Sequence, residues 1–156
     1  MKSPNSSPEF LRRISRRRRS APNPVESIAE YIEQCAALLT SEHLEELQAE
    51  LPPLNIRFAT ITAPKFPHLP QQLKLLVDFL GDAAAGKFSD GSDASRRETA
   101  FALRYTAKEI DIIPDFISEI GYADDSLIVR TVLRRHKDLF RDYCRFRGIR
   151  WITLAP

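Results

Sequence analysis

The stretch "DDSLIVRTVLRRHKDLFRDYCRFR", residues 124–147, has the residue spacing of a long amphipathic helix. Its apolar residues recur at intervals of four and seven, so they share one face of a helix and would pack on a core. These residues are Ile128, Val132, Leu139 and Tyr143. The stretch therefore predicts one helix over about 124–147 and, with it, a helical protein.

The same stretch carries a second stripe, made of basic residues. They follow one another at spacings of four, three, four and four, which places them on one face of a continuous helix: Arg130, Arg134, Lys137, Arg141 and Arg145. One interpretation is a solvated face, partly neutralised by Asp138 and Asp142. The other is a binding face for an anionic partner. We expect an acidic protein surface first, then nucleic acid or an anionic membrane surface.

Working towards the N-terminus, "YTAKEIDIIPDFISEIGYADD", residues 105–125, places four aspartates among isoleucines. A structural interpretation accounts for each of them. Asp115 follows Pro114 in the first turn of a short helix, and Asp124 and Asp125 open the last helix as a cap and a first-turn acid. Gly121 supplies a positive φ where a helical turn closes. Asp111 either caps backbone amides or hydrogen-bonds Tyr105 or an arginine.

The alternative interpretation is chemical. Asp111, Asp115, Asp124 and Asp125 could converge on Mg²⁺ or Ca²⁺, which take hard oxygen ligands, and the site would then activate water as a hydrolase does. Their spacing matches no EF-hand loop. We favour the structural interpretation, which requires no metal or other cofactor.

This stretch resembles the signature of the YkvA-like family, a bacterial domain of unknown function. The resemblance covers about residues 95–135 and rests on the order and spacing of nine positions: Tyr105, Asp111, Ile113, Pro114, Asp115, Ile117, Gly121, Asp124 and Asp125. Glu109 and Ser118 stand where the family usually has prolines. The resemblance implies a helical fold and no particular activity.

The remaining sequence predicts further helices over 24–39 and 41–51, from Leu69 to about Leu80, and from a cap at Ser92 or Asp93. Residues 52–70 contain five prolines and predict an extended connection. The predicted fold is all-α, a small bundle of about five to six helices with one proline-rich extended connection. We expect residues 24–156 to form a single helical domain that contains the motif at 105–125.

Residues 1–23 differ from the rest in composition, being rich in Ser, Pro and Arg and poor in apolar residues. Such a segment buries too little apolar surface to offset the entropy of ordering, so we expect a disordered basic arm. The first twenty residues hold seven Lys or Arg and one Glu, with a run at Arg16, Arg17, Arg18 and Arg19. The arm is either a solubilising tail or a second contact for an anionic partner.

The composition and the motifs of the sequence limit the classes of function that we consider. Cys35 and Cys144 have no nearby partner in sequence and read as buried residues of a reducing, cytoplasmic compartment. No apolar run approaches the roughly 18–20 residues of a transmembrane segment. A nucleophile elbow, a P-loop and a dinucleotide fingerprint are all missing from the sequence. These features favour a non-catalytic binding or adaptor module, with the aspartate hydrolase as the alternative and the oligomeric state undefined.

Overall fold

The computed structural model describes residues 24–107, 122–154 and 156. In this part of the chain all regular structure is helical, which confirms the predicted all-α fold. The elements are α2 (Pro24–Ala37), α3 (Ser41–Ala59), α4 (Leu69–Ala84), α5 (Asp93–Thr106), α6 (Ala123–Arg135), α7 (Lys137–Arg147) and the 3₁₀ turn η1 (Trp151–Leu154).

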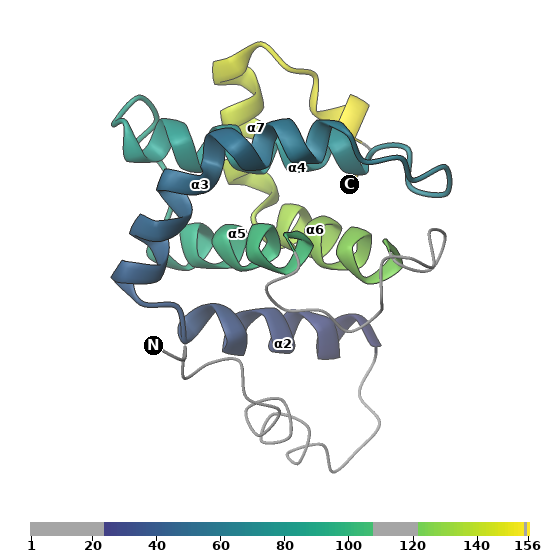
Figure 1. Cartoon of the computed structure of the whole chain (residues 1–156), viewed down its shortest axis with the longest axis horizontal. Helices are drawn as coiled ribbons and strands as arrows, with labels where there is room; N and C mark the ends of the chain where they lie inside the picture. The colour runs from purple at the N-terminus through teal and green to yellow at the C-terminus, as the bar shows by residue number, and fades with distance from the viewer. Residues whose placement is uncertain (1–23, 108–121, 155) are drawn as a thin grey trace.

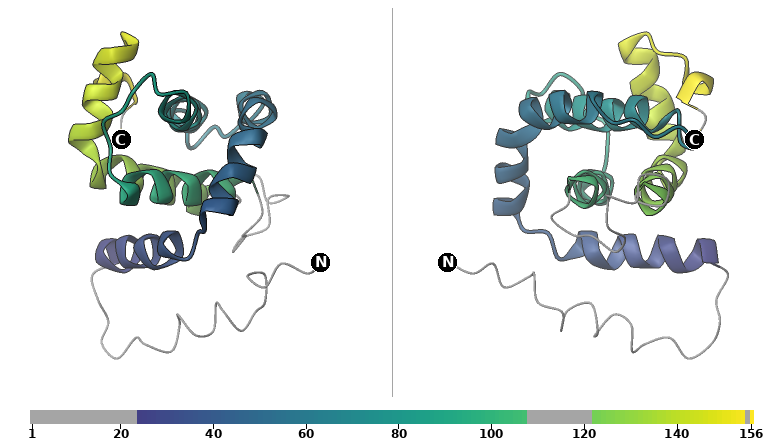
Figure 2. Two further views of the ribbon diagram at one scale, coloured as in Figure 1. Left: turned by 90° about the vertical axis from the view of Figure 1, so that its left-hand side faces the viewer. Right: turned by 45° about the vertical axis from the view of Figure 1, so that its right-hand side comes forward.

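The helices lie in three tiers, with α5 in the middle tier (Figure 1). α5 and α6 lie in the middle tier, with α2 on one side and α4 with the second half of α3 on the other (Figures 1 and 2). The four consecutive residues of α5 from Ala100 to Leu103 are all buried. Because consecutive helical residues point in different directions, α5 is covered on every side. It is the central helix of the core.

Capping side chains mark the starts of α5 and α3, both close to where the sequence predicts them. The Ser92 hydroxyl oxygen accepts a hydrogen bond from the Ser95 amide at 3.1 Å, so α5 begins at the predicted cap. At the start of α3, the Thr40 side chain accepts the His43 amide, and His43 Nδ1 accepts the Thr40 amide. This reciprocal pair satisfies two of the amides that a helix start leaves without partners.

The prediction for residues 52–70 is wrong in its first part. α3 does not end at Leu51 but continues through Pro52 and Pro53 to Ala59. Leu54 and Phe58 are buried against the core, and this burial outweighs the two backbone hydrogen bonds that the prolines cannot donate. α3 changes direction along its length (Figure 2), as is expected of a helix with prolines in its interior. Turns, without a strand, connect α3 to α4.

The single helix predicted over 124–147 is also wrong, because the chain breaks at His136 into α6 and α7. His136 has φ −113° and ψ 37°, outside the helical region. α7 then leaves the middle tier and packs on α4, where the ring centroids of Phe140 and Phe79 are 5.1 Å apart. Of the predicted apolar stripe, Ile128, Val132 and Tyr143 are buried and Leu139 is half-buried.

Both cysteines are buried and unpaired, as predicted. Burial raises the pKa of each thiol to about 11, so neither is a ready nucleophile at neutral pH. Among the described helices, none combines the length and the apolar character required to cross a bilayer.

Candidate functional site

The structure describes three members of the aspartate-rich motif, namely Tyr105, Asp124 and Asp125. Tyr105 lies in the last turn of α5, and the two aspartates lie in the first turn of α6. The predicted roles of four other members fall outside the described residues: Asp111, Pro114, Asp115 and Gly121. The motif therefore joins the end of the central helix to the start of the next one.

Asp124 is held by a tyrosine and does not serve as the predicted helix cap. The N-cap of α6 is Tyr122, and no side chain caps this helix. The buried hydroxyl of Tyr105 donates a hydrogen bond to Asp124 Oδ2. Burial, and then this bond and the charge of Asp124, raise the pKa of Tyr105, so the phenol stays protonated and remains a donor.

A second tyrosine, Tyr31, and a second aspartate, Asp125, lie near this pair. Tyr31 of α2 lies close enough for the Asp124 charge to contribute to the rise in its pKa, after burial and the influence of Cys35. Asp125 is fully buried beside Asp124. Asp124 Oδ1 is buried and meets no hydrogen-bond donor among the described residues. No group of three or more His, Cys, Asp or Glu side chains suited to a metal ion occurs in 24–107, 122–154 and 156.

A buried ion cluster joins α5 to the break between α6 and α7. Arg135 donates from Nε and Nη2 to the two oxygens of Glu98, both at 3.0 Å, and His136 Nε2 lies 2.6 Å from Glu98 Oε2. Burial alone would favour the neutral acid, but the hydrogen bonds from His136 and Arg135 outweigh it and lower the pKa of Glu98. The sequence does not predict this cluster of Glu98, Arg135 and His136.

A second ion cluster fixes α7 to α4. Tyr143 donates to Asp82 Oδ2 at 2.7 Å, and Arg147 Nη1 reaches the same oxygen at 3.2 Å. Arg147 Nη2 also lies 3.5 Å from Asp78. Asp82 and Tyr143 belong to different predicted helices, and no spacing rule connects them. Arg147 therefore helps to hold α7 against α4.

The basic residues of the predicted stripe separate into three groups. Arg134, Lys137 and Arg141 are exposed, and their side chains make no ion pair or hydrogen bond with any other described residue. Arg145 is exposed and pairs with Asp142 at 3.0 Å. Arg130 is half-buried and lines a cavity of about 220 Å³ together with His68, Gln72 and Ser126. Because the helix breaks at His136, the five basic residues do not lie along one continuous helix as predicted: Arg134 is in the last turn of α6, and Lys137 and Arg141 are on α7. We name Arg134, Lys137 and Arg141 the free basic face; the arginines 16–19 of the arm lie outside the described residues.

The aspartate-rich motif lies within a segment that matches a known family. Residues 97–129 match a family described as protein of unknown function (DUF1232). The match spans most of α5 and the first half of α6, and so includes Tyr105, Asp124 and Asp125. The matched segment of this chain thus includes both residues of the Tyr105–Asp124 hydrogen bond. A search of curated proteins found no match, and neither did a search of solved structures.

Proposed function

We propose that the chain is a non-catalytic binding or adaptor module that contacts an acidic protein surface. The free basic face, together with the basic arm, supplies the contact. We also propose that the chain is a YkvA-like protein, a finer assignment than the family match over 97–129 provides.

One observation carries the proposal: neighbouring arginines of α6 and α7 differ in what they bind. Arg135 and Arg147 lie against Glu98 and Asp82, where they hold helices together. Arg134 and Arg141 have no such partner among the described residues and are exposed to solvent. Cations that the fold does not use are available to an outside partner, and exposed charges of one sign attract an opposite surface over about 10 Å.

The charge pattern of α7 favours a protein over a nucleic acid. Asp138 and Asp142 alternate along the chain with Lys137, Arg141 and Arg145. A phosphate backbone is uniformly negative and would repel both aspartates. An acidic polypeptide also carries backbone N–H donors between its carboxylates, so it can accommodate the two aspartates within the same interface.

The test is charge reversal at the free basic face. Binding of the full chain to poly-L-glutamate would be measured by fluorescence anisotropy, with a duplex DNA and phosphatidylserine vesicles as competing anions. We expect Arg134→Glu with Arg141→Glu to weaken binding to poly-L-glutamate by about tenfold or more. Lys87→Glu with Arg150→Glu makes the same change in net charge at other exposed positions and serves as the matched control.

Two outcomes would contradict the proposal. The first is equal weakening by both double variants, which would reduce the effect to net charge alone. The second is a clear preference for duplex DNA or vesicles over poly-L-glutamate at equal charge, which would assign the face to nucleic acid or to a membrane surface.

A further inference from the structure

A cavity of about 220 Å³ lies between α6 and the start of α4, which are at the same end of the molecule (Figure 1). α6 contributes Ser126 and Arg130, which lie one helical turn apart on the same face. The rest of the lining comes from the turn before α4 and the first residues of that helix: Lys65, Phe66, Pro67, His68, Leu69 and Gln72. The lining by described residues thus holds two cations and an imidazole, and it includes no acid.

Two hydrogen-bond donors of α6 in this lining lack a protein partner. Arg130 is half-buried, and its side chain makes no ion pair or hydrogen bond with another described residue. Its Nε is buried, but its two Nη groups retain accessible surface. Ser126 is only 4% exposed, and its hydroxyl has no partner among the described residues. Because Ser126 is covered elsewhere and lines the cavity, the surface that it retains faces the cavity.

The start of α4 adds positive potential beside the same cavity. Its N-cap is His68, which makes no side-chain capping bond, and the first turn of α4 contains no acid. The first amides of a helix have no intrahelical partners, and they carry the positive end of the helix dipole. A negative ligand next to His68 and Leu69 would therefore be stabilised by the helix as well as by the side chains.

We propose that this cavity binds a phosphate group, as inorganic phosphate or as the phosphate of a small monoester. From α6, the Nη groups of Arg130 and the hydroxyl of Ser126 donate to its oxygens. From the other side, Lys65 contributes charge, and His68 offers a ring N–H, which an imidazole has in either tautomer. A tetrahedral oxyanion accepts donors from several directions, so it can use both sides of the cavity at once.

This site goes beyond the contact with an acidic protein surface and does not depend on it. None of its lining residues belongs to the free basic face. The two sites also select different ligands, since the cavity takes a small oxyanion and the face takes an extended acidic surface. Each can therefore fail without the other.

Inorganic phosphate is the probe for the test, and acetate at equal ionic strength is the comparison anion. The full chain, labelled with ¹⁵N, would be titrated with each anion at pH 7 and followed by NMR. We expect phosphate to shift the backbone amide signals of Gln72, Ser126 and Arg130 in a saturable way. Acetate should bind about tenfold or more weakly, because it has fewer oxygens and less charge to accept these donors.

Two variants remove the donors of α6. Arg130→Gln should weaken phosphate binding by about tenfold or more, the loss expected for charge-assisted hydrogen bonds. Ser126→Ala removes a single oxygen and leaves the helix intact. It should weaken phosphate binding by about threefold or more. The amide signals outside the cavity should stay unchanged in both variants.

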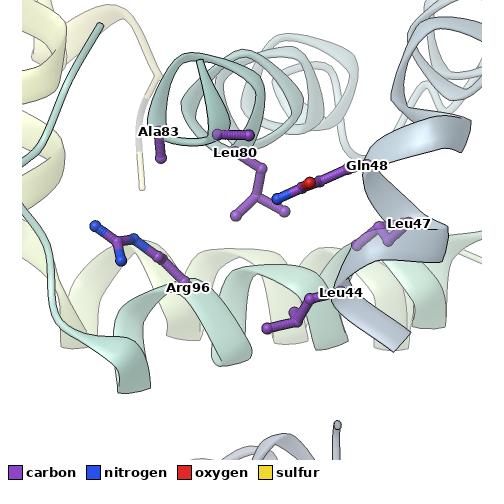
Figure 3. A pocket seen from close by; sticks show the side chains of 7 residues that line it. Leu44, Leu47, Gln48, Leu80, Ala83 and Arg96 are labelled. Carbon is purple, nitrogen blue, oxygen red and sulfur yellow. The ribbon is translucent and has the colours of Figure 1, made fainter. Parts of the chain in front are cut away.

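Two other arginines provide matched controls. Arg96 is also half-buried with a buried Nε that has no described acceptor, but it lines a different cavity among α3, α4 and α5 (Figure 3). Arg134 belongs to the free basic face and lies one helical turn beyond Arg130. Arg96→Gln and Arg134→Gln should each bind phosphate as the unaltered chain does.

The proposal is overturned if the shifts with phosphate fail to saturate or if acetate binds as tightly as phosphate. It is also overturned if either control loses as much affinity as Arg130→Gln, because the effect would then be one of net charge. Vesicles that contain phosphatidic acid separate the two sources of a phosphate group. If they bind through Arg130 while inorganic phosphate does not bind, the cavity takes a lipid headgroup and the proposal of a free phosphate is wrong.

Discussion

At the scale of single residues, three acidic groups determine how the helices fit together. Glu98, Asp82 and Asp124 each accept hydrogen bonds from a residue on another helix. A buried carboxylate is costly unless its oxygens are satisfied, so each of these acids selects the helix arrangement that supplies its donors. Their contribution is therefore to specificity of packing as much as to stability.

The Glu98 cluster gives the first prediction. Glu98→Gln leaves Arg135 with only its 3.5 Å pair to the exposed Glu33, and we expect a loss of about 2–3 kcal/mol in the free energy of unfolding. That is somewhat less than for a fully buried pair, because the Arg135 side chain is 30% exposed. Urea denaturation at pH 7 measures the loss. Asp93→Asn is the control on the same helix, where the carboxylate is 74% exposed and the pair with Arg97 should contribute under about 1 kcal/mol.

The difference in stability between Glu98→Gln and the unaltered chain should depend on pH. The pKa of Glu98 is lower in the folded state than its ordinary value of 4.5. Its ionisation therefore stabilises the fold fully above that ordinary value, and the stabilisation is lost as pH falls through the lowered pKa. The stability gap between the unaltered chain and Glu98→Gln should narrow below about pH 4.5. A gap that stays constant down to pH 3 would contradict the assignment.

The Tyr105–Asp124 bond gives the second prediction. Tyr105→Phe removes the donor and leaves the carboxylate less satisfied, so we expect a loss of about 1–3 kcal/mol in the free energy of unfolding. Combined with Asp124→Ala in a double-mutant cycle, the two changes should couple by about 1 kcal/mol or more. If the two losses in the free energy of unfolding simply add in the double variant, the Tyr105–Asp124 hydrogen bond contributes no coupling energy.

The aspartate hydrolase remains testable with the same variants. Under the structural interpretation, Mg²⁺ or Ca²⁺ should leave the thermal midpoint unchanged relative to EDTA. A rise with either ion that disappears in Asp124→Ala would favour the metal-dependent alternative.

At the scale of helices, local signals predict where several helices begin, whereas contacts between residues far apart in the sequence accompany the places where they bend or break. The cap at Ser92 and the helix that starts at Pro24 follow from residues a few positions apart, so the sequence alone predicts them. At the break, His136 contacts Glu98, which lies 38 positions earlier. A periodic pattern through residues 124–147 contains no information about that contact. The same limit applies to the ion clusters of the candidate site, which combine residues from different helices.

The second half of α3 gives a prediction that distinguishes a helix from an extended segment. In a helix, Leu54 and Phe58 share a face and Ile56 points elsewhere, whereas in an extended segment all three alternate residues share one face. Leu54 and Phe58 are buried, and Ile56 is 73% exposed. Phe58→Ala should therefore cost about 3–5 kcal/mol in the free energy of unfolding, and Ile56→Ala should stay within about 0.5 kcal/mol. Comparable losses for both variants would support the extended connection.

At the scale of the whole molecule, positive charge has two roles. Inside, Arg135 and Arg147 join helices through buried acids; outside, the free basic face has no described partner. The sequence adds a basic arm to a body that is mildly acidic without it. Two cationic segments of one chain can engage one acidic surface together, which makes the second contact effectively intramolecular.

The last prediction follows from that coupling. Removal of residues 1–20 and reversal of Arg134 and Arg141 should each lower the affinity for poly-L-glutamate by about tenfold or more, because each leaves a single contact. The combined variant should retain no salt-sensitive binding between about 50 and 200 mM salt, where screening acts on exposed charges. Each variant would be compared at both salt concentrations, with circular dichroism as a check that the helices remain. If removal of the arm leaves the affinity and its salt dependence unchanged, the arm takes no part and the free basic face binds alone.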